Sequence, residues 1–503
     1  MSDLLTHEEY KTIAAELIFP AANFIDGSFR AAQSGKTMPT VNPATGADLA
    51  QIPASGAEDV DFAVEKARQA FEDGRWAKLH PAERKAVLIK LCKLIKRNRR
   101  ELAVLESLDS GKPIADCEQI DIPETINTIM WHAELIDKIY DQTAPVGDDA
   151  LAIIVREPVG VVGAVLPWNF PMLMVAWKIG PALAAGNSVV LKPAEQTSMT
   201  ALRMAELAHE AGVPAGVFNV VCGMGADVGE PLGKHMDVDM VSFTGSTETG
   251  RRFLHYAADS NLKNVVLECG GKNPFVVLDD AEDLDLIAGH LVSGAFWNMG
   301  ENCSASSRLI VHEKVKDALL EQVLAHAKEW RTGDPLNPVN NLGALVDTDH
   351  FKKVSSYLKK GKKSATVILG GETADGKFVM PTIFDQAAAD SDIVKDEIFG
   401  PVLSVLTVAS NDEAIRLAND TPYGLAASIF SANAKRAIRA ARDIRAGTVT
   451  VNSYGEGDIS TPFGGFKQSG FGGRDNSIHA HDQFTELKTI WVDLSDRPDE
   501  AMG

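Results

Sequence analysis

The chain has 503 residues, which at ~150 residues per domain suggests about three domains, and its 45% hydrophobic residues suffice for a large core. The formal net charge of −20 argues against nucleic acid and anionic membranes as partners, because phosphate groups attract a surplus of lysine and arginine. The sequence shows neither the basic and apolar regions of a signal peptide nor the ~20 apolar residues of a membrane span, so we expect neither feature.

Helices are expected over roughly 58–139, and from about residue 160 short β-branched runs alternate with helical ones. Apolar residues at helical spacing predict a helix from about residue 201, and Gly212 ends it. Strands are predicted at 161–166, 188–191, 217–221, 240–243 and 265–267. This βα repeat indicates a mostly parallel, doubly wound sheet.

A second βα series follows, so the sequence predicts two α/β domains in tandem. The apolar residues of 284–295 share one helical face. Segment 487–492 alternates like an edge strand without a neighbouring partner, and we expect it to pair with an arm elsewhere, in this subunit or another. Further strands are predicted at 275–278, 309–311, 367–369, 402–405 and 448–451.

Cysteine usage indicates a reducing compartment, and we expect a cytoplasmic protein without a bound metal. The five cysteines are few and odd in number, and none has CxxC spacing, which disfavours a disulfide framework or a zinc site. We expect Cys92, Cys117 and Cys222 to be core thiols. Cys269 extends an apolar strand, so we expect it to be buried and unreactive.

One cysteine and one glutamate stand out chemically. Cys303 lies in a turn rich in glycine, asparagine and serine, where a thiol is accessible. Glu268 ends the strand at 265–267. A thiol nucleophile and a separate carboxylate base can form an acyl-enzyme and then hydrolyse it.

Several strand ends carry polar residues suited to a cofactor or to an oxyanion. Residues 245–250 (GSTETG) suit a diphosphate at a helix N-terminus, yet they match neither a P-loop nor the GxGxxG fingerprint, and a generic turn is the alternative. Lys192 and Glu195 could bind ribose hydroxyls or form a solvated ion pair. Asn169 could donate to an oxyanion or simply occupy a turn.

Seven segments, taken in order, resemble the aldehyde dehydrogenase superfamily. They are PWNFP (167–171), LKPAEQTS (191–198), FTGSTETG (243–250), LECGGKNP (267–274), GENCSASSRL (300–309), EIFGP (397–401) and PFGGFKQSG (462–470). The resemblance implies an α/β subunit with two doubly wound domains, one binding NAD on a non-standard Rossmann sheet and one catalytic, plus a β-stranded oligomerisation arm.

The resemblance also implies domain boundaries and an oligomer. It assigns 1–139 and 162–270 to the NAD-binding domain and 271–482 to the catalytic domain. The oligomerisation arm would comprise 140–161 and 483–503. Members of the family are dimers or tetramers, so we expect a homo-oligomer.

The resemblance assigns three catalytic roles. The Cys303 thiolate attacks the aldehyde carbonyl, and the Asn169 amide with the Cys303 backbone N–H holds the oxyanion. Hydride transfer to the nicotinamide leaves a thioester, for which Glu268 activates water.

For the cofactor, the resemblance places Lys192 and Glu195 at the adenosine ribose. The charge of Glu195 favours NAD by repelling a 2′-phosphate, although Lys192 could also contact a phosphate, which leaves NADP open as a less efficient cofactor. The remaining positions assigned to the cofactor are Trp168, Gly225, Phe243, Thr244, Gly245, Ser246 at the diphosphate, Glu397 at the nicotinamide ribose, and Phe399 beside it.

For the substrate, segments 455–463 and 484–491 resemble those of the aminoaldehyde subgroup, which includes γ-glutamyl-γ-aminobutyraldehyde and guanidinobutyraldehyde dehydrogenases of polyamine and arginine breakdown. Trp177, Trp297 and Phe463 match positions that line the substrate tunnel, and aromatic faces attract cations. Asp121 and Asp458 match positions where acids meet the amino group. The alternative is an apolar lining with two solvated aspartates. Related betaine-aldehyde enzymes carry Trp in place of Phe463, which argues against quaternary ammonium substrates.

Four other functions are alternatives. A broad-specificity aldehyde dehydrogenase fits the same catalytic residues. A CoA-acylating semialdehyde dehydrogenase typically lacks the base that Glu268 provides. A cysteine hydrolase needs a histidine beside Cys303, and none of the twelve histidines lies in a recognisable signature. A structural, crystallin-like role would not require the set of Cys303, Glu268 and Asn169.

Overall fold

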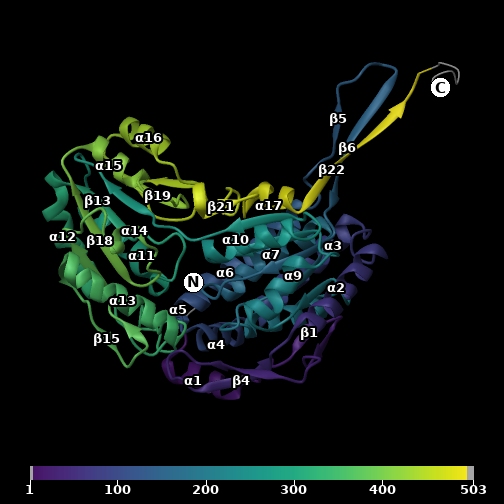
Figure 1. Ribbon diagram of the computed structural model, residues 1–503, viewed down its shortest axis with the longest axis horizontal. Coiled ribbons are helices and arrows are strands. Elements are labelled where there is room, and N and C mark those ends of the chain that lie inside the picture. Colours follow the sequence, from purple (N-terminus) through teal and green to yellow (C-terminus); the bar gives the residue numbers. More distant parts are fainter. Residues whose placement is uncertain (1–3, 496–503) are drawn as a thin grey trace.

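The computed structural model describes residues 4–495 (Figure 1). Five parallel strands form the centre of its first sheet. The β-branched runs form strands because both faces of the sheet are covered by other elements, which favours continuous apolar segments. Within the described residues the sheet has eight strands in the order β2-β1-β9-β8-β7-β10-β11-β21. The central strands are β7 (Val161–Val165), β8 (Ser188–Lys192), β9 (Phe218–Val220), β10 (Met240–Thr244) and β11 (Asn264–Glu268).

Three short antiparallel strands complete this sheet at its two edges. They are β1 (Asn23–Ile25), β2 (Ser28–Arg30) and β21 (Gly470–Phe471). Strand β21 lies inside the range 271–482 assigned to the catalytic domain, yet it pairs with β11 of the first sheet. The chain therefore returns to the first sheet before it ends.

The second sheet has seven strands within residues 4–495, in the order β14-β17-β18-β13-β12-β19-β20. Its pairs are parallel except for the edge pair of β14 and β17. The strands are β12 (Pro274–Val277), β13 (Arg308–His312), β14 (Thr366–Leu369), β17 (Thr382–Asp385), β18 (Val402–Val408), β19 (Ala426–Phe430) and β20 (Thr448–Val451).

Helices cover both sheets, and α7 (Pro171–Ala185) is buried along its whole length. The helices of the first part are α1 (His7–Glu16), α2 (Ala57–Glu72), α3 (Pro81–Arg97), α4 (Arg99–Ser110), α5 (Ile114–Asp116), α6 (Ile122–Leu135), α8 (Met199–Ala211), α9 (Glu230–Lys234) and α10 (Thr247–Ala258). Those of the second part are α11 (Leu284–Phe296), α12 (Glu313–Lys328), α13 (Thr348–Ser364), α14 (Asp392–Lys395), α15 (Asn411–Asn419), α16 (Ala434–Asp443) and α17 (Ser477–Gln483). Two small hairpins are formed by β3 (Thr37–Val41) with β4 (Asp48–Pro53), and by β15 (Thr373–Ala374) with β16 (Phe378–Val379). The expectation of a mixed α/β fold is confirmed.

A three-stranded arm projects from the body of the molecule (Figure 1). It consists of β5 (Gln142–Ala144), β6 (Ala150–Pro158) and β22 (Thr485–Asp493), and β22 pairs antiparallel with β6 along its full length. The C-terminal edge strand predicted from its alternating pattern thus finds its partner in the same chain. Residues 496–503 of the expected arm lie outside the described residues.

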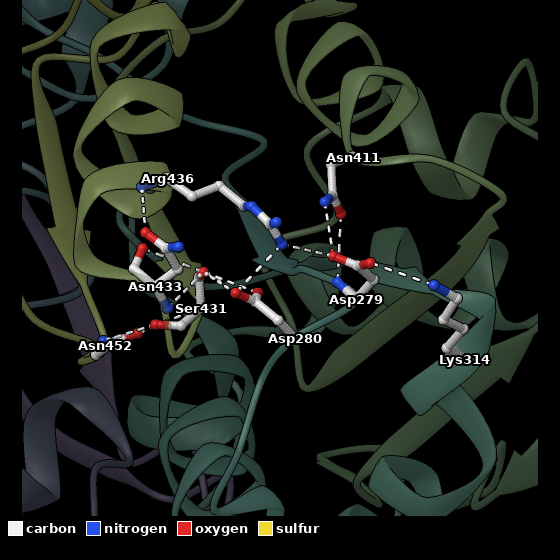
Figure 2. Close-up of polar contacts among 8 residues, drawn as sticks. All are labelled: Asp279, Asp280, Lys314, Asn411, Ser431, Asn433, Arg436 and Asn452. Atoms are coloured by element: carbon white, nitrogen blue, oxygen red, sulfur yellow. Dashed lines mark hydrogen bonds and ion pairs between the residues drawn. The ribbon is translucent and has the colours of Figure 1, made fainter.

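A polar network fixes the carboxyl ends of β12, β19 and β20 (Figure 2). Ser431 and Asn452 exchange two hydrogen bonds, of 3.0 and 3.1 Å, between the Asn452 side chain and the Ser431 backbone. Asp280 accepts from the Ser431 hydroxyl at 2.8 Å and pairs with Arg436 at 3.2 Å. Asn452 has a left-handed backbone (φ 55°), so these bonds fix the point at which the chain turns toward the first sheet. The other members are Asp279, Lys314, Asn411 and Asn433.

Gly447 directly precedes β20, and it tests how closely the chain packs at the amino end of that strand. A Cβ atom at this position would lie 1.7 Å from the Gly464 carbonyl oxygen. Gly447→Ala should therefore lower the Tm of the protein by forcing the two segments apart, at a cost of about 1–3 kcal/mol. The matched control is Gly225→Ala, because a Cβ there meets no atom within 4 Å. Thermal unfolding without added cofactor measures the Tm of both variants, and equal Tm values would contradict this close packing.

Candidate active site

The carboxyl edge of the first sheet gathers residues that lie far apart in the sequence. Parallel pairing aligns Val165 with Lys192, and Thr244 with Glu268. The segments that follow β7, β8 and β10 therefore leave the sheet at the same edge, which is where α/β proteins bind their ligands. Asn169 follows the first of these strands.

A cavity of about 270 Å³ opens at this edge, and residues of both sheets line it. Cys303, Glu268 and Asn169 all belong to its wall. The other lining residues form two groups by chemistry. The mostly polar group, called the polar end below, comprises Thr244, Gly245, Ser246, Glu268, Cys269, Gly270, His350, Lys353, Glu397, Phe399, Pro167, Trp168 and Asp475. The mostly aromatic and apolar group, called the aromatic end below, comprises Phe170, Leu173, Met174, Trp177, Trp297, Glu456 and Phe463.

The nucleophile candidate Cys303 follows a stretch of unusual backbone. Asn298, Met299 and Gly300 have consecutive positive φ values of 52°, 56° and 68°. A Cβ at Gly300 would lie 2.2 Å from the Gly400 carbonyl oxygen, so only glycine fits this turn. The Cys303 carbonyl accepts a hydrogen bond of 2.7 Å from the Asn273 side chain, which fixes the residue at the cavity wall.

Burial raises the pKa of the Cys303 thiol well above its usual value, and the nearby carboxylates Glu456, Glu397 and Glu268 raise it further. The thiol is therefore protonated in the free protein at neutral pH. Cys269 also lines the cavity, and burial raises its pKa to about 12. All five cysteines are free.

Asn169 is held in a fixed orientation by the segment that precedes Cys303. Its Nδ2 donates to the Glu301 carbonyl at 2.9 Å, while Asn298 Nδ2 donates to the Asn169 carbonyl at 3.1 Å. No other acceptor within residues 4–495 takes the second proton of Asn169 Nδ2. That proton is free to reach an oxyanion formed at Cys303.

Glu268 is 3% exposed, and its carboxyl group sits beside a buried ion pair. Burial raises its pKa well above the usual value, and Asp475 raises it further, whereas Lys178 and Arg474 lower it. Lys178 Nζ and Asp475 Oδ2 are 2.8 Å apart, and both side chains are almost fully buried. The pair thus sets the charge state of a carboxyl group that could act as a base.

The polar end of the cavity contains a carboxylate and a cluster of rings. Glu397 Oε1 accepts from the Gly271 backbone N–H at 2.9 Å. The Trp168 ring lies 5.3 Å from Phe399 and 5.0 Å from His350, measured between centroids. His350 Nε2 lies 2.6 Å from the Phe399 carbonyl oxygen, and burial lowers the pKa of His350 to about 4, so its ring is neutral.

No histidine within the described range hydrogen bonds Cys303, so the cysteine-hydrolase alternative gains no support. The sequence reasoning missed His350 and Lys353, which both line the cavity. They lie on α13 outside every motif, and only the approach of that helix to the first sheet brings them to the site.

Four residues expected at the cofactor lie outside the cavity wall. Lys192 and Glu195 form a 2.8 Å ion pair where β8 ends, at the same sheet edge. Gly225 is exposed and begins the π-helical turn 225–229. Phe243 is buried beneath Gly245, where its ring would meet an added Cβ at 2.6 Å, so it shapes the wall from behind.

The aromatic end of the cavity contains the three rings expected from the sequence. Trp177 and Phe463 have centroids 5.2 Å apart, and Phe170 lies 5.2 Å from Trp297. These two pairs of rings form an apolar wall, and a cationic group could contact the faces of the rings.

The structure does not bring Asp121 and Asp458 to this cavity. Asp121 is fully buried and pairs with the buried ammonium group of Lys112, because a buried cation requires a counter-charge. Asp458 is exposed and accepts hydrogen bonds from the backbone and hydroxyl of Ser460. The carboxylate that does line the wall is Glu456, which the sequence reasoning missed.

Comparison with known proteins identifies the family. A model of the aldehyde dehydrogenase family matches residues 29–490. The chain belongs to the aldehyde dehydrogenase family. The resemblance drawn from seven sequence segments is therefore confirmed. No helix within residues 4–495 has the length and apolarity that a membrane crossing requires.

Three similar proteins illustrate the relationship. An aminoacetaldehyde dehydrogenase of Pseudomonas aeruginosa is 64% identical over 98% of this chain and 100% of its own length. The structure of a γ-glutamyl-γ-aminobutyraldehyde dehydrogenase from Burkholderia cenocepacia is 48% identical with a TM-score of 0.96, covering 98% of this chain and 100% of that one. The structure of P. syringae indole-3-acetaldehyde dehydrogenase AldA, a mutant in complex with NAD+ and IAA, gives the same identity, coverage and TM-score.

The buried ion pair should control the pH dependence of Glu268. A base works deprotonated, so the rate of the step that uses it rises with pH through its pKa. Asp475→Asn removes a negative neighbour and should move the acid limb of kcat to lower pH, by about one unit. Lys178→Met removes a positive neighbour and should move that limb to higher pH. Shifts of both variants in the same direction would contradict this electrostatic assignment. Melting curves identify any loss of folding.

Proposed function

We propose that this protein oxidises an aldehyde to its carboxylic acid through a covalent bond to Cys303, with NAD as the hydride acceptor. The observation that carries the proposal is the meeting of a thiol, a free amide N–H and a buried carboxyl group in one cavity wall, namely those of Cys303, Asn169 and Glu268. The related enzymes named above act on aldehydes, and one of them is held in complex with NAD+.

In the first half of the reaction, the Cys303 sulfur attacks the aldehyde carbon and the carbonyl oxygen becomes an oxyanion. The Asn169 Nδ2 proton that has no protein acceptor within residues 4–495, together with the Cys303 backbone N–H, stabilises this charge. Each such donor is worth about 10²–10³ in rate. Because the pKa of the thiol is raised, its proton must pass to solvent as the bond forms.

Loss of a hydride from the substrate carbon turns the oxyanion adduct into a thioester. In the second half, Glu268 takes a proton from a water molecule that attacks the thioester carbon. The raised pKa of Glu268 makes it a stronger base than an exposed glutamate. The carbon–sulfur bond then breaks, the acid departs and Glu268 returns the proton to the sulfur. A water-activating carboxylate in the cavity would destroy a thioester destined for CoA, so Glu268 weighs against an acylating enzyme.

The cavity fits a dinucleotide at its polar end. Gly270 leaves room for the Glu397 carboxylate, which would lie 2.2 Å from a Cβ at this position. Glu397 and Ser246 would hold the nicotinamide ribose and the diphosphate, with Trp168 and Phe399 beside the ring. Lys192 and Glu195 would hold the adenosine ribose. When bound, NAD accepts the hydride released from the substrate carbon.

An aminoaldehyde is the substrate class that the observations favour. The relative with 64% identity is named for aminoacetaldehyde, and another is named for γ-glutamyl-γ-aminobutyraldehyde. The substrate end of the cavity is lined by Trp177, Trp297 and Phe463, whose ring faces attract a cationic group.

The arm supports a homo-oligomer. Strand β22 exposes apolar side chains that no other part of the described chain covers, among them Leu487 at 69% and Trp491 at 61%. Exposed apolar strands of this kind mark association surfaces. We assign the NAD-binding part to 1–139 and 162–270, the catalytic part to 271–482 and the arm to 140–161 and 483–503, with β21 returning to the first sheet.

Cys303→Ser should abolish NADH formation, with a loss of at least about a thousandfold, because serine lacks an accessible thiolate. Binding of NAD should persist, since the residues at the polar end are unchanged, and quenching of tryptophan fluorescence can follow it. Cys269→Ser is the matched control and should retain activity. Persistent turnover in the Cys303 variant would assign the chemistry to another residue.

Glu268→Gln should separate the two halves of the reaction. The thioester still forms, so a rapid burst of NADH equal to the enzyme concentration is expected, followed by slow turnover, because no base activates water. Rapid-mixing absorbance measures the burst, and mass spectrometry of the quenched protein detects the acyl group on Cys303. A normal steady-state rate would remove Glu268 from the mechanism.

A further inference from the structure

Glu456 provides a carboxylate in the cavity wall that the proposed chemistry does not use. It lies on the segment that follows β20 and lines the cavity together with Cys303 and the aromatic residues. Its Oε1 accepts a hydrogen bond of 2.5 Å from the Ser304 hydroxyl. Because Ser304 directly follows Cys303, the carboxylate lies close to the reacting sulfur.

The charge of Glu456 has no cationic partner in the described part of the chain. No lysine, arginine or histidine of residues 4–495 forms an ion pair with it, and no hydrogen bond from those residues reaches its Oε2. The side chain is half-buried and lines the same cavity as Trp297 and Phe463. An unpaired carboxylate in such surroundings costs free energy, which a cationic ligand would offset.

Two contacts before Glu456 hold the start of its loop in place. Asn452 is bound to Ser431 in the polar network that fixes the start of the loop (Figure 2). The Tyr454 hydroxyl accepts from Asn302 Nδ2 at 3.2 Å. The carboxylate therefore has a defined position relative to Cys303, as a specificity residue requires.

We propose that Glu456 binds the ammonium group of the substrate and thereby selects aldehydes whose amino group lies only a few bonds from the carbonyl. This proposal rests on the proposed oxidation of aldehydes, and it assigns the substrate specificity of that reaction to one residue. The carbonyl carbon must reach Cys303. The ammonium group must reach the Glu456 carboxylate, which is hydrogen bonded to Ser304, the residue next to Cys303. Short aminoaldehydes such as aminoacetaldehyde and 3-aminopropanal satisfy both requirements.

A second carboxylate adds to the negative potential here. Burial raises the pKa of Glu456, the hydrogen bond from Ser304 lowers it, and the charge of Glu124 on α6 raises it. Glu124 is exposed, which places it on the solvent side. A cationic substrate would be attracted by both charges, and neutral aldehydes of the same size by neither.

The test compares matched substrates with Glu456→Gln, which keeps the shape and removes the charge. The pairs are aminoacetaldehyde with propanal and 3-aminopropanal with butanal, each differing by an ammonium group in place of a methyl group. The variant should lose about 10- to 100-fold in kcat/KM for the amino member, the range of a charge-assisted hydrogen bond, chiefly through KM. The kcat/KM values for propanal and butanal should stay unchanged.

Two variants separate recognition from structure. Asp458→Asn removes an exposed carboxylate two residues away and should leave all four substrates unaffected. Ser304→Ala removes the hydrogen bond to Glu456 but keeps its charge, so the preference for the amino member should survive. Equal losses for both members of a pair in Glu456→Gln would show that Glu456 only supports the loop, and would overturn the inference.

The remaining outcomes are also decisive. A Glu456→Gln variant that keeps the wild-type preference for amino substrates overturns the inference while aldehyde oxidation stands. Wild-type protein that oxidises propanal and aminoacetaldehyde equally well overturns it too. Wild-type protein that forms NADH from none of the four aldehydes removes the proposed function itself.

Discussion

The site depends on the contact between the segment that carries the nucleophile and the segment that follows β7. Asn298 donates to the Asn169 carbonyl, and Asn169 in turn donates to the Glu301 carbonyl. These bonds join a turn before β13 of the second sheet to a turn of the first sheet. The positive φ values from Asn298 to Gly300 are tolerated because the surrounding structure holds them in place. Without this contact, the sulfur and the oxyanion donor would belong to separate parts of the molecule.

The second constraint on the cavity is the electrostatic effect of the carboxyl groups in its wall. Three carboxyl groups, those of Glu268, Glu397 and Glu456, surround the thiol and raise its pKa. The concentration of like charge is unfavourable for folding, and strongly perturbed groups of this kind gather at functional sites. Lys178 compensates part of the charge through its pair with Asp475.

Much of the fold follows from local patterns, since the strands at 161–166, 188–191 and 265–267 are apolar runs of strand length. Strand β19 (Ala426–Phe430) escaped prediction because its alanines have little strand preference, and burial between β12 and β20 decides its structure. The pairing of β21 with β11 joins residues about two hundred positions apart, and no local signal reports it.

The site shows the same division between local and distant information. Cys303, Glu268 and Asn169 are recognisable because their neighbours in sequence form motifs. His350 and Lys353 are not, because only the docking of α13 brings them to the cavity.

The position of Glu456 shows that neighbouring acids on one loop can lie in different surroundings. An acid was expected at Asp458, and Glu456 occupies the wall instead. Gly457 between them has a φ of 95°, a conformation that favours glycine, and Asp458 beyond it is exposed. A sequence pattern reports which residues are near each other but not on which side of such a turn each one lies.

The place of Glu456 also couples recognition to reactivity. Its charge is the first of the three that hold the thiol of Cys303 in the protonated form. An ammonium group bound at Glu456 offsets that charge, so the pKa of the thiol falls when a cationic substrate is in place. A neutral aldehyde leaves the repulsion intact. Selectivity for the amino group would then appear in the formation of the thiolate as well as in binding, since the same carboxylate governs both.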